Sequence, residues 1–109
     1  MLNLRSFYKL LFGAICIGIF SSASAAGDAA AGKVKAIPCM GCHGIPGYFT
    51  VYPTYHVPRV KGQHSDYIIY ALKAYKSGQR QHETMQAQAA TLSEQDMADI
   101  AVYFSTGSE

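Results

Sequence analysis

The heptapeptide PCMGCHG, residues 38–44, holds two cysteines, Cys39 and Cys42, with His43 directly after the second. Side chains at this spacing suit three chemistries: a structural zinc site, a redox-active disulfide, or the covalent attachment of a haem. Each chemistry needs different surroundings in the chain. The rest of the sequence therefore decides which of them fits and, with it, the fold.

Residues 1–25 have the pattern of a secretory signal peptide. A positively charged start is followed by an apolar run of 11 residues, 10–20, which is short beside the roughly 20 that a membrane-spanning helix needs. The small residues at 23–25 read ASA and fit a signal cleavage site. We therefore expect cleavage there, or one residue later, and a periplasmic domain of residues 26–109 with no stable membrane insertion.

Export changes the charge and the cysteine count of the chain. Losing Arg5, Lys9 and Cys16 with the signal leaves seven Lys and Arg (9 − 2) against seven Asp and Glu, and two cysteines (3 − 1). A chain with zero net charge and no basic stripe does not predict nucleic-acid binding. An exported domain of about 84 residues usually needs disulfides or a bound group to complete its core. Two cysteines three residues apart close too small a loop, so a large apolar cofactor is the better candidate.

Two of the three chemistries lack the surroundings that they need. A structural zinc site requires four ligands, normally in two clustered pairs. The other histidines are scattered along the chain: His56, His64 and His82. A thioredoxin-like cysteine pair opens a helix that follows a strand, whereas residues 26–37, AGDAAAGKVKAI, have a helical composition. Zinc and disulfide exchange are therefore the weaker interpretations.

Haem attachment fits every residue of the motif. In C-x-x-C-H the two thiols bond to the two vinyl groups of a haem, and the adjacent histidine binds the iron. Export agrees with this interpretation, because bacterial haem attachment of this type takes place outside the cytoplasm. We therefore predict one covalently attached haem c, with its iron, held by Cys39, Cys42 and His43.

Three segments have helical patterns, and no strand pattern competes with them. They are residues 28–39, 65–77 and 94–105. Asp28 and Ser93 stand where side chains cap helix N-termini. Pro38 and Gly78 stand where helices often stop. The third segment carries an apolar stripe at i, i+3, i+4 and i+7, made by Met97, Ile100, Ala101 and Phe104. The fold class is predicted to be all-α.

At this point the chain resembles the class I cytochrome c family, and it is similar to small periplasmic monohaem bacterial cytochromes c and to one half of the dihaem cytochromes. The resemblance covers nearly all of the mature chain. It rests on AAAGKVKAIPCMGCHG (29–44), PRVKGQHSDYIIYALKAYKSGQR (58–80), TMQAQAA (84–90) and LSEQDMADIAVYFS (92–105). It implies a class I cytochrome c fold with three main helices wrapped around one covalently bound haem.

The resemblance also implies roles for residues around the haem. The carbonyl of Pro58 would accept a hydrogen bond from Nδ1 of His43 and so orient the ring. Val60 would pack on the haem, although leucine is more common there in the family. Met85 is the implied distal iron ligand opposite His43. His82, three residues before Met85, is the alternative distal ligand and would give a lower reduction potential.

Several other residues have structural interpretations. Gly32 is expected to let the last helix approach closely near Tyr103 and Phe104. Three tyrosines of the second helix are expected mostly in the core: Tyr67, Tyr70 and Tyr75. The loop between the attachment motif and Pro58 carries four aromatic rings: Tyr48, Phe49, Tyr52 and Tyr55. These rings either close the haem pocket or form an exposed docking surface for a redox partner, and the sequence leaves both open.

An iron with protein ligands on both sides has no open position for a substrate, so one-electron exchange is its expected chemistry. We therefore predict a periplasmic one-electron carrier that cycles between Fe(III) and Fe(II) and is not an enzyme. The alternatives are a haem-bearing subunit of a larger periplasmic oxidoreductase and an open-site haem enzyme or gas sensor. The expected partners are redox proteins whose identity the sequence does not give, and the expected state is a monomer or a subunit of a redox complex.

Overall fold

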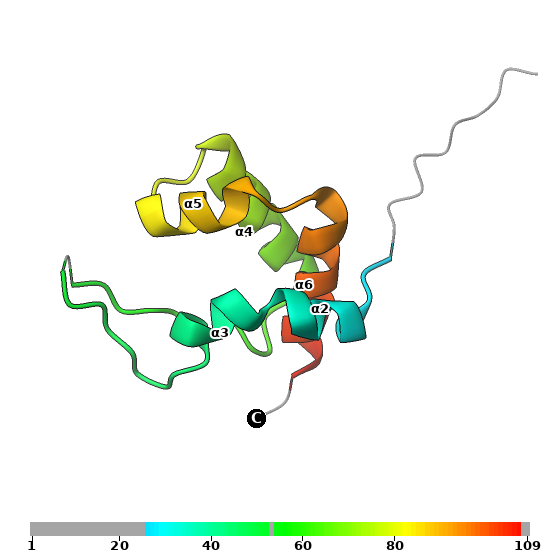
Figure 1. The fold of residues 1–109 in the computed structure, drawn as a ribbon, viewed down its shortest axis with the longest axis horizontal. Coiled ribbons are helices and arrows are strands. Elements are labelled where there is room, and N and C mark those ends of the chain that lie inside the picture. The colour runs from blue at the N-terminus through cyan, green and yellow to red at the C-terminus, as the bar shows by residue number, and fades with distance from the viewer. Residues whose placement is uncertain (1–25, 53, 108–109) are drawn as a thin grey trace, which may run out of the picture.

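The computed structural model describes residues 26–52 and 54–107, which form a helical domain (Figure 1). The helices of this described part are α2 (Ala29–Lys35), α3 (Ile37–His43), α4 (Ser65–Ser77), α5 (Glu83–Ala90) and α6 (Glu94–Thr106). Extended backbone pairs in these residues only at an isolated bridge between Phe49 and His56. The all-α prediction is confirmed, whereas the predicted signal peptide, residues 1–25, lies outside the described residues. No helix in the described part is both long and apolar enough to cross a membrane.

The first predicted helix, residues 28–39, is two helices, and its predicted end is wrong. The side chain of Asp28 caps α2 as expected, accepting a hydrogen bond from the backbone of Ala30. The helix ends at Lys35, Ala36 serves as the junction, and α3 continues to His43. Pro38 lies in the first turn of α3, where a helix needs no N–H donor, so it starts this helix instead of stopping one.

The bounds of α4 match the prediction, and α6 ends one residue beyond it. Gly78 ends α4 with a left-handed φ of +79°, as its position predicted. His64 precedes α4 but makes no side-chain cap hydrogen bond. Ser93 and Asp96 form a reciprocal capping box at the start of α6, in which each side chain accepts the backbone N–H of the other. Local cap chemistry therefore fixes both long helices.

Gly32 allows α2 to pack directly on α6. A Cβ atom at this position would lie 2.0 Å from the carbonyl oxygen of Asp99 and 2.9 Å from Cβ of Tyr103. Only a residue without a side chain fits there. The expected close approach is confirmed, with Asp99 and Tyr103 as the neighbours.

The core lies where α2, α4, α5 and α6 meet. Its fully or nearly buried members are Ala36, Ile68, Leu72, Ala89, Met97, Ile100, Ala101 and Phe104. All four residues of the predicted α6 stripe are among them. Half-buried apolar side chains pack against this cluster, and they include Cys39, Val60 and Met85. These predicted haem-facing residues are thus in contact with the core without being fully buried in it.

Two tyrosines of α4 lie on the surface, so their predicted place in the core is wrong. Tyr67 and Tyr70 are exposed, whereas Tyr75 packs against the core cluster. The hydroxyl of Tyr67 accepts a hydrogen bond from Arg80 at 3.2 Å, and the Arg80 guanidinium lies 4.8 Å from the ring centre of Tyr75. The polar end of the Tyr67 ring thus has a surface cation as its hydrogen-bond partner, and full burial of this ring would remove that partner.

Candidate functional site

The two thiols and the imidazole of the CMGCH motif share one helix. Cys39, Cys42 and His43 stand at i, i+3 and i+4 of α3, which places them on the same helical face. Both cysteines are half-buried and neither forms a disulfide. Burial raises the pKa of the Cys39 thiol above its ordinary value. Two free thiols on one face, next to an imidazole, form a donor set that suits the attachment of a flat ring system.

The ring of His43 is oriented by the segment that follows the aromatic loop. Its Nδ1 donates a hydrogen bond to the carbonyl oxygen of Pro58 at 2.7 Å. This bond uses Nδ1 and leaves Nε2 as the nitrogen that can bind a metal. The segment is itself anchored to α6, because the backbone N–H of Gly62 donates to the carbonyl of Phe104 at 2.9 Å. The contact implied by the resemblance is present, and its role toward an iron stays a prediction.

Met85 lies in the first turn of α5, a helix that the sequence analysis did not predict. Its side chain is half-buried and packs against the core cluster, as Val60 does. His82 precedes the helix as its N-cap, and its Nδ1 accepts from the backbone N–H of Met85 at 3.4 Å. His82 therefore uses Nδ1 locally, while the thioether of Met85 makes no helix-cap contact. The choice between the two as a distal ligand stays a prediction.

The backbones of the two helices that carry the proposed iron ligands lie apart. Among the described helices, the backbone of α3 approaches only that of α2, and the backbone of α5 approaches only that of α4. In Figure 1, α3 and α5 extend to the same side of the molecule, one above the other in this view. Each helix has a half-buried apolar side chain that packs against the core, Cys39 in α3 and Met85 in α5. A flat apolar group that bonds to α3 on one side and meets α5 on the other fits this arrangement, so the residues present suit a haem.

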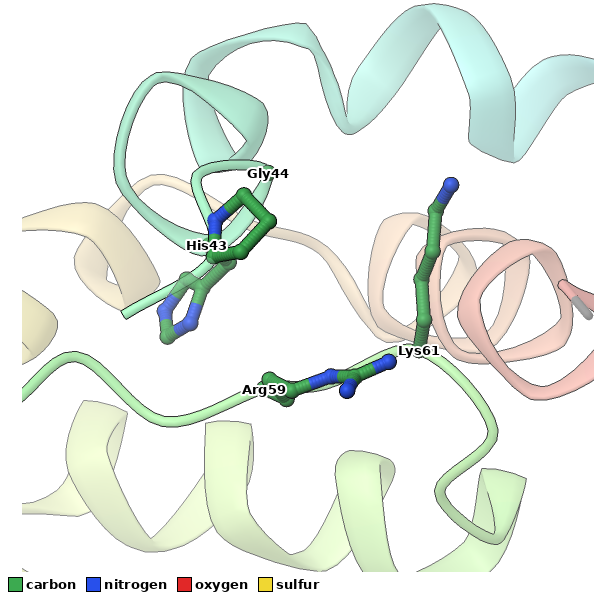
Figure 2. Close-up of a pocket in the computed structure, with 5 residues that line it drawn as sticks. His43, Gly44, Arg59 and Lys61 are labelled. Atoms are coloured by element: carbon green, nitrogen blue, oxygen red, sulfur yellow. The ribbon is translucent and has the colours of Figure 1, made fainter. Parts of the chain in front are cut away.

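A second feature near His43 was not predicted from the sequence. A cavity of about 190 Å³ is lined by His43, Gly44, Pro46, Arg59 and Lys61. In Figure 2 the His43 imidazole points away from the Arg59 guanidinium, which extends toward Lys61. Arg59 and Lys61 therefore bring two cations to the same cavity as His43. Their spacing is in the sequence, but only the path of the chain shows that they lie beside the histidine.

The aromatic loop forms a hairpin-like excursion from the site. The backbone N–H of Thr50 donates to the carbonyl of Tyr55, and that of Val57 donates to the carbonyl of Tyr48, each at 2.9 Å. Its tip is exposed, with Tyr52 at 96% exposure. Tyr55 is 50% exposed, and its ring contacts that of His82, with ring centres 5.0 Å apart. One ring of the loop thus reaches the distal segment while another faces solvent.

Known proteins similar to this chain agree with the geometry. The profile of the family Cytochrome c matches residues 29–108. Cytochrome c4 of Pseudomonas aeruginosa is 39% identical over 92 residues, covering 84% of this chain and 44% of that protein. Cytochrome c-554(548) of Halomonas halodenitrificans is 43% identical over 84 residues, covering 74% of this chain and 98% of that protein. The chain spans less than half the length of the cytochrome c4 relatives that it matches.

A profile match over residues 29–108, joined to relatives at 39% and 43% identity over most of this chain, settles the family. The family implies covalently bound haem c, and the cysteine pair with its adjacent histidine fits the attachment of one such group. The chain belongs to the cytochrome c family.

Proposed function

We propose that this chain is a periplasmic one-electron carrier. When bound, the haem iron supplies a single electron by changing between Fe(II) and Fe(III). The observation that carries the proposal is a pair of helices on the same side of the molecule: α3, with both thiols and an oriented imidazole, and α5, with a half-buried thioether. The chain is proposed not to be an enzyme, because two protein ligands leave no coordination position for a substrate.

The proposed roles of the residues follow from their positions. Cys39 and Cys42 form the two thioether bonds, which fix the cofactor to one face of α3. His43 would bind the iron through Nε2, and Met85 would bind it through its sulfur. Val60 packs on the haem from the half-buried edge of the core. A histidine–methionine pair favours a higher reduction potential than two histidines do, which suits a carrier.

Fixed ligands also make electron exchange easier. The hydrogen bond from His43 to Pro58 fixes the proximal ring to one segment, and the backbone bond from Gly62 to Phe104 fixes that segment to α6. A ligand held in this way changes position little when the charge of the iron changes. The structural reorganisation that accompanies electron transfer is therefore kept small.

The partners are proposed to be redox proteins that donate and accept electrons in the periplasm. A haem-bearing subunit of a larger periplasmic oxidoreductase is the second candidate, and the lengths of the relatives favour keeping it. The matched region is 44% of one cytochrome c4 but 98% of cytochrome c-554(548), so this kind of domain occurs both within a longer protein and as nearly the whole of one. Purification from the periplasm distinguishes a monomer from a subunit, because a subunit elutes with its partner.

The test uses the protein purified from periplasm after expression of the full chain. Mass spectrometry is expected to show residues 26–109, or 27–109, plus one haem that resists extraction by acidic acetone. Redox titration is expected to show a single one-electron transition. Free thiols at Cys39 and Cys42 in the mature protein would rule out covalent haem. Carbon monoxide binding to the native ferrous protein, or substantial peroxide turnover, would instead support an open-site enzyme or sensor.

A further inference from the structure

His82 makes two hydrogen bonds to the first turn of α5, one through its side chain and one through its backbone. Its Nδ1 accepts a hydrogen bond from the backbone N–H of Met85 at 3.4 Å. Its own backbone N–H donates to the side-chain oxygen of Gln86 at 3.2 Å. The two bonds run in opposite directions between His82 and the residues 85 and 86, as in a capping box, and the backbone of Met85 takes part in one of them. Histidine is not among the common cap residues, so the sequence pattern did not reveal this arrangement.

The aromatic loop adds a contact to the same cap. The ring of Tyr55 lies 5.0 Å from that of His82, tilted by 53°, which is a favourable geometry for two aromatic rings. Tyr55 is fixed within its loop, because its backbone N–H donates to Oγ1 of Thr50 and its carbonyl accepts from the N–H of Thr50, both at 2.9 Å. A second ring pair, Phe49 with His56 at 4.8 Å, spans the base of the hairpin. The ring of Tyr55 therefore approaches α5 from an ordered support.

The chain of contacts connects the two sides of the site. The hairpin begins five residues after His43 and ends at Val57, directly before the Pro58 that orients the His43 ring. Through Tyr55 and His82 the same segment reaches the backbone of Met85. One loop thus contacts the support of the proximal ligand and the support of the proposed distal ligand.

We propose that Tyr55 and His82 are positioning residues that hold Met85 in place for binding the iron; this inference rests on Met85 being the distal ligand in the proposed function. α5 has only eight residues, and Met85 lies in its first turn, where helices fray most readily. Removing the cap frees the N–H of Met85 and lets that turn open. Removing the Tyr55 ring leaves the His82 ring without its neighbour. Both changes raise the fraction of time that the methionine is off the iron.

The test measures that fraction in the ferric holoprotein as the rate at which cyanide replaces the distal ligand. His82→Ala is expected to react about fivefold faster than wild type, the size of effect that loss of an average helix cap gives. Tyr55→Ala is expected to react about threefold faster, as for loss of one aromatic pair. Tyr55→Phe keeps the ring and is expected to match wild type. His82→Asn keeps a cap but removes the ring that Tyr55 contacts, so it is expected to react more slowly than His82→Ala and about as fast as Tyr55→Ala.

Two matched controls separate positioning from general loosening of the fold. His64 is also a helix N-cap but makes no side-chain cap bond, and Tyr52 is in the same loop but is 96% exposed. His64→Ala and Tyr52→Ala are therefore expected to stay within twofold of wild type. The thermal midpoint of each variant is measured alongside the cyanide rate. If His82 positions Met85, the cyanide rate of His82→Ala rises more than that of a control variant with the same drop in thermal midpoint.

The outcomes distinguish this inference from the ligand assignment beneath it. Met85→Ala abolishes the methionine–iron charge-transfer absorption if Met85 is the ligand, whatever the other variants do. If that holds and the His82 and Tyr55 variants react no faster than their controls, the positioning inference is wrong and the ligand assignment stands. If wild type lacks the absorption band and His82→Ala opens the iron to carbon monoxide, His82 is itself the ligand and both proposals are wrong.

Discussion

Where α2 packs on α6, protein atoms fill the interior of the domain, whereas around α3 and α5 they leave apolar side chains half covered. On the first side, Gly32 brings two backbones together and Met97 is fully buried. On the second side, Cys39 and Met85 are only half-buried where they pack against the core, and the backbones of the two helices that carry them do not approach each other. Side chains complete one region, and the haem of this family completes the other.

The comparison explains how a chain this short can hold a stable fold. A domain of this size buries a smaller fraction of its surface than a larger domain does. Small domains therefore often rely on disulfides, a metal or another bound group for stability. Here the addition is concentrated in the region that the helices leave open. Changes on the packed side should therefore reduce stability and leave the spectrum alone. Changes on the open side should alter the iron or the presence of the cofactor.

The largest expected effect comes from preventing haem attachment. Replacing both Cys39 and Cys42 by serine removes the thioether bonds, and the haem-free chain then exposes the half-buried edge of the core to water. We expect it to lack a cooperative thermal transition and to lose most of its helical circular dichroism. A haem-free chain with wild-type helicity and a sharp transition would contradict the division into a packed and an open region.

Two methionines test the comparison directly, because each belongs to one region. Met97 is fully buried in the α6 stripe, so Met97→Ala should lower the free energy of unfolding by about 3 kcal/mol and keep the methionine–iron absorption band. Met85 is half-buried, so Met85→Ala should cost about 1 kcal/mol in stability. The same change should abolish the band, lower the reduction potential and allow carbon monoxide to bind. Denaturant titration and visible spectroscopy of both variants check the pair, and a reversed result would reassign the ligand.

The sequence predicts the long helices well because their signals are local. Gly78 supplies the left-handed turn that ends α4, and the Ser93 cap begins α6. The same local logic fails at Pro38, because a proline stops one helix or starts another depending on whether the chain has already turned at Ala36. The short helix α5 has neither a strong cap residue nor an apolar stripe, so nothing in the sequence distinguished it from a loop.

The site divides in the same way. The thiols and the imidazole lie within five residues, so their spacing, joined to the helical composition before them and the lack of a second ligand pair, predicts the cofactor. The contact between Tyr55 and His82 joins residues 27 positions apart (82 − 55), so it depends on the path of the whole loop. The exposure of Tyr67 and Tyr70 likewise depends on which face of α4 meets the core. Composition gives the residue types, but only packing gives these neighbours.

A smaller effect is expected from a methyl group added on the packed side. Gly32→Ala places a carbon 2.0 Å from the Asp99 carbonyl oxygen, so α2 and α6 must separate. We expect a loss of about 2 kcal/mol in unfolding free energy, as for other overpacked cores, measured by urea titration of the holoprotein. Gly41→Ala is the matched control, because its added carbon meets nothing within 4 Å and alanine favours the helix. Equal losses in both variants would show that the close approach is not what Gly32 provides.

The smallest expected change in stability concerns the ion pair between Lys35 and Asp99, where α2 packs on α6. Asp99 is buried between α2 and α6, and it accepts hydrogen bonds from Lys35 at 2.5 Å, the Asp28 backbone at 2.8 Å and Gln95 at 2.7 Å. These donors, Lys35 first, hold the pKa of the Asp99 carboxyl below its ordinary value. The contact therefore contributes to stability where the carboxyl is ionised in both the folded and the unfolded chain.

The pH dependence of that contribution has a definite sign. An aspartate in an unfolded chain has a pKa of about 3.9. In the folded protein the pKa of Asp99 lies below that value. The stabilisation is therefore complete above that pH, and it is lost as the pH falls through the folded pKa. Asp99→Asn removes the charge, so the difference in unfolding free energy between wild type and variant should be constant from about pH 5 to 7 and shrink below pH 4. Urea titrations at fixed ionic strength measure it, and a difference that grows on acidification would mean that Asp99 opposes folding when ionised.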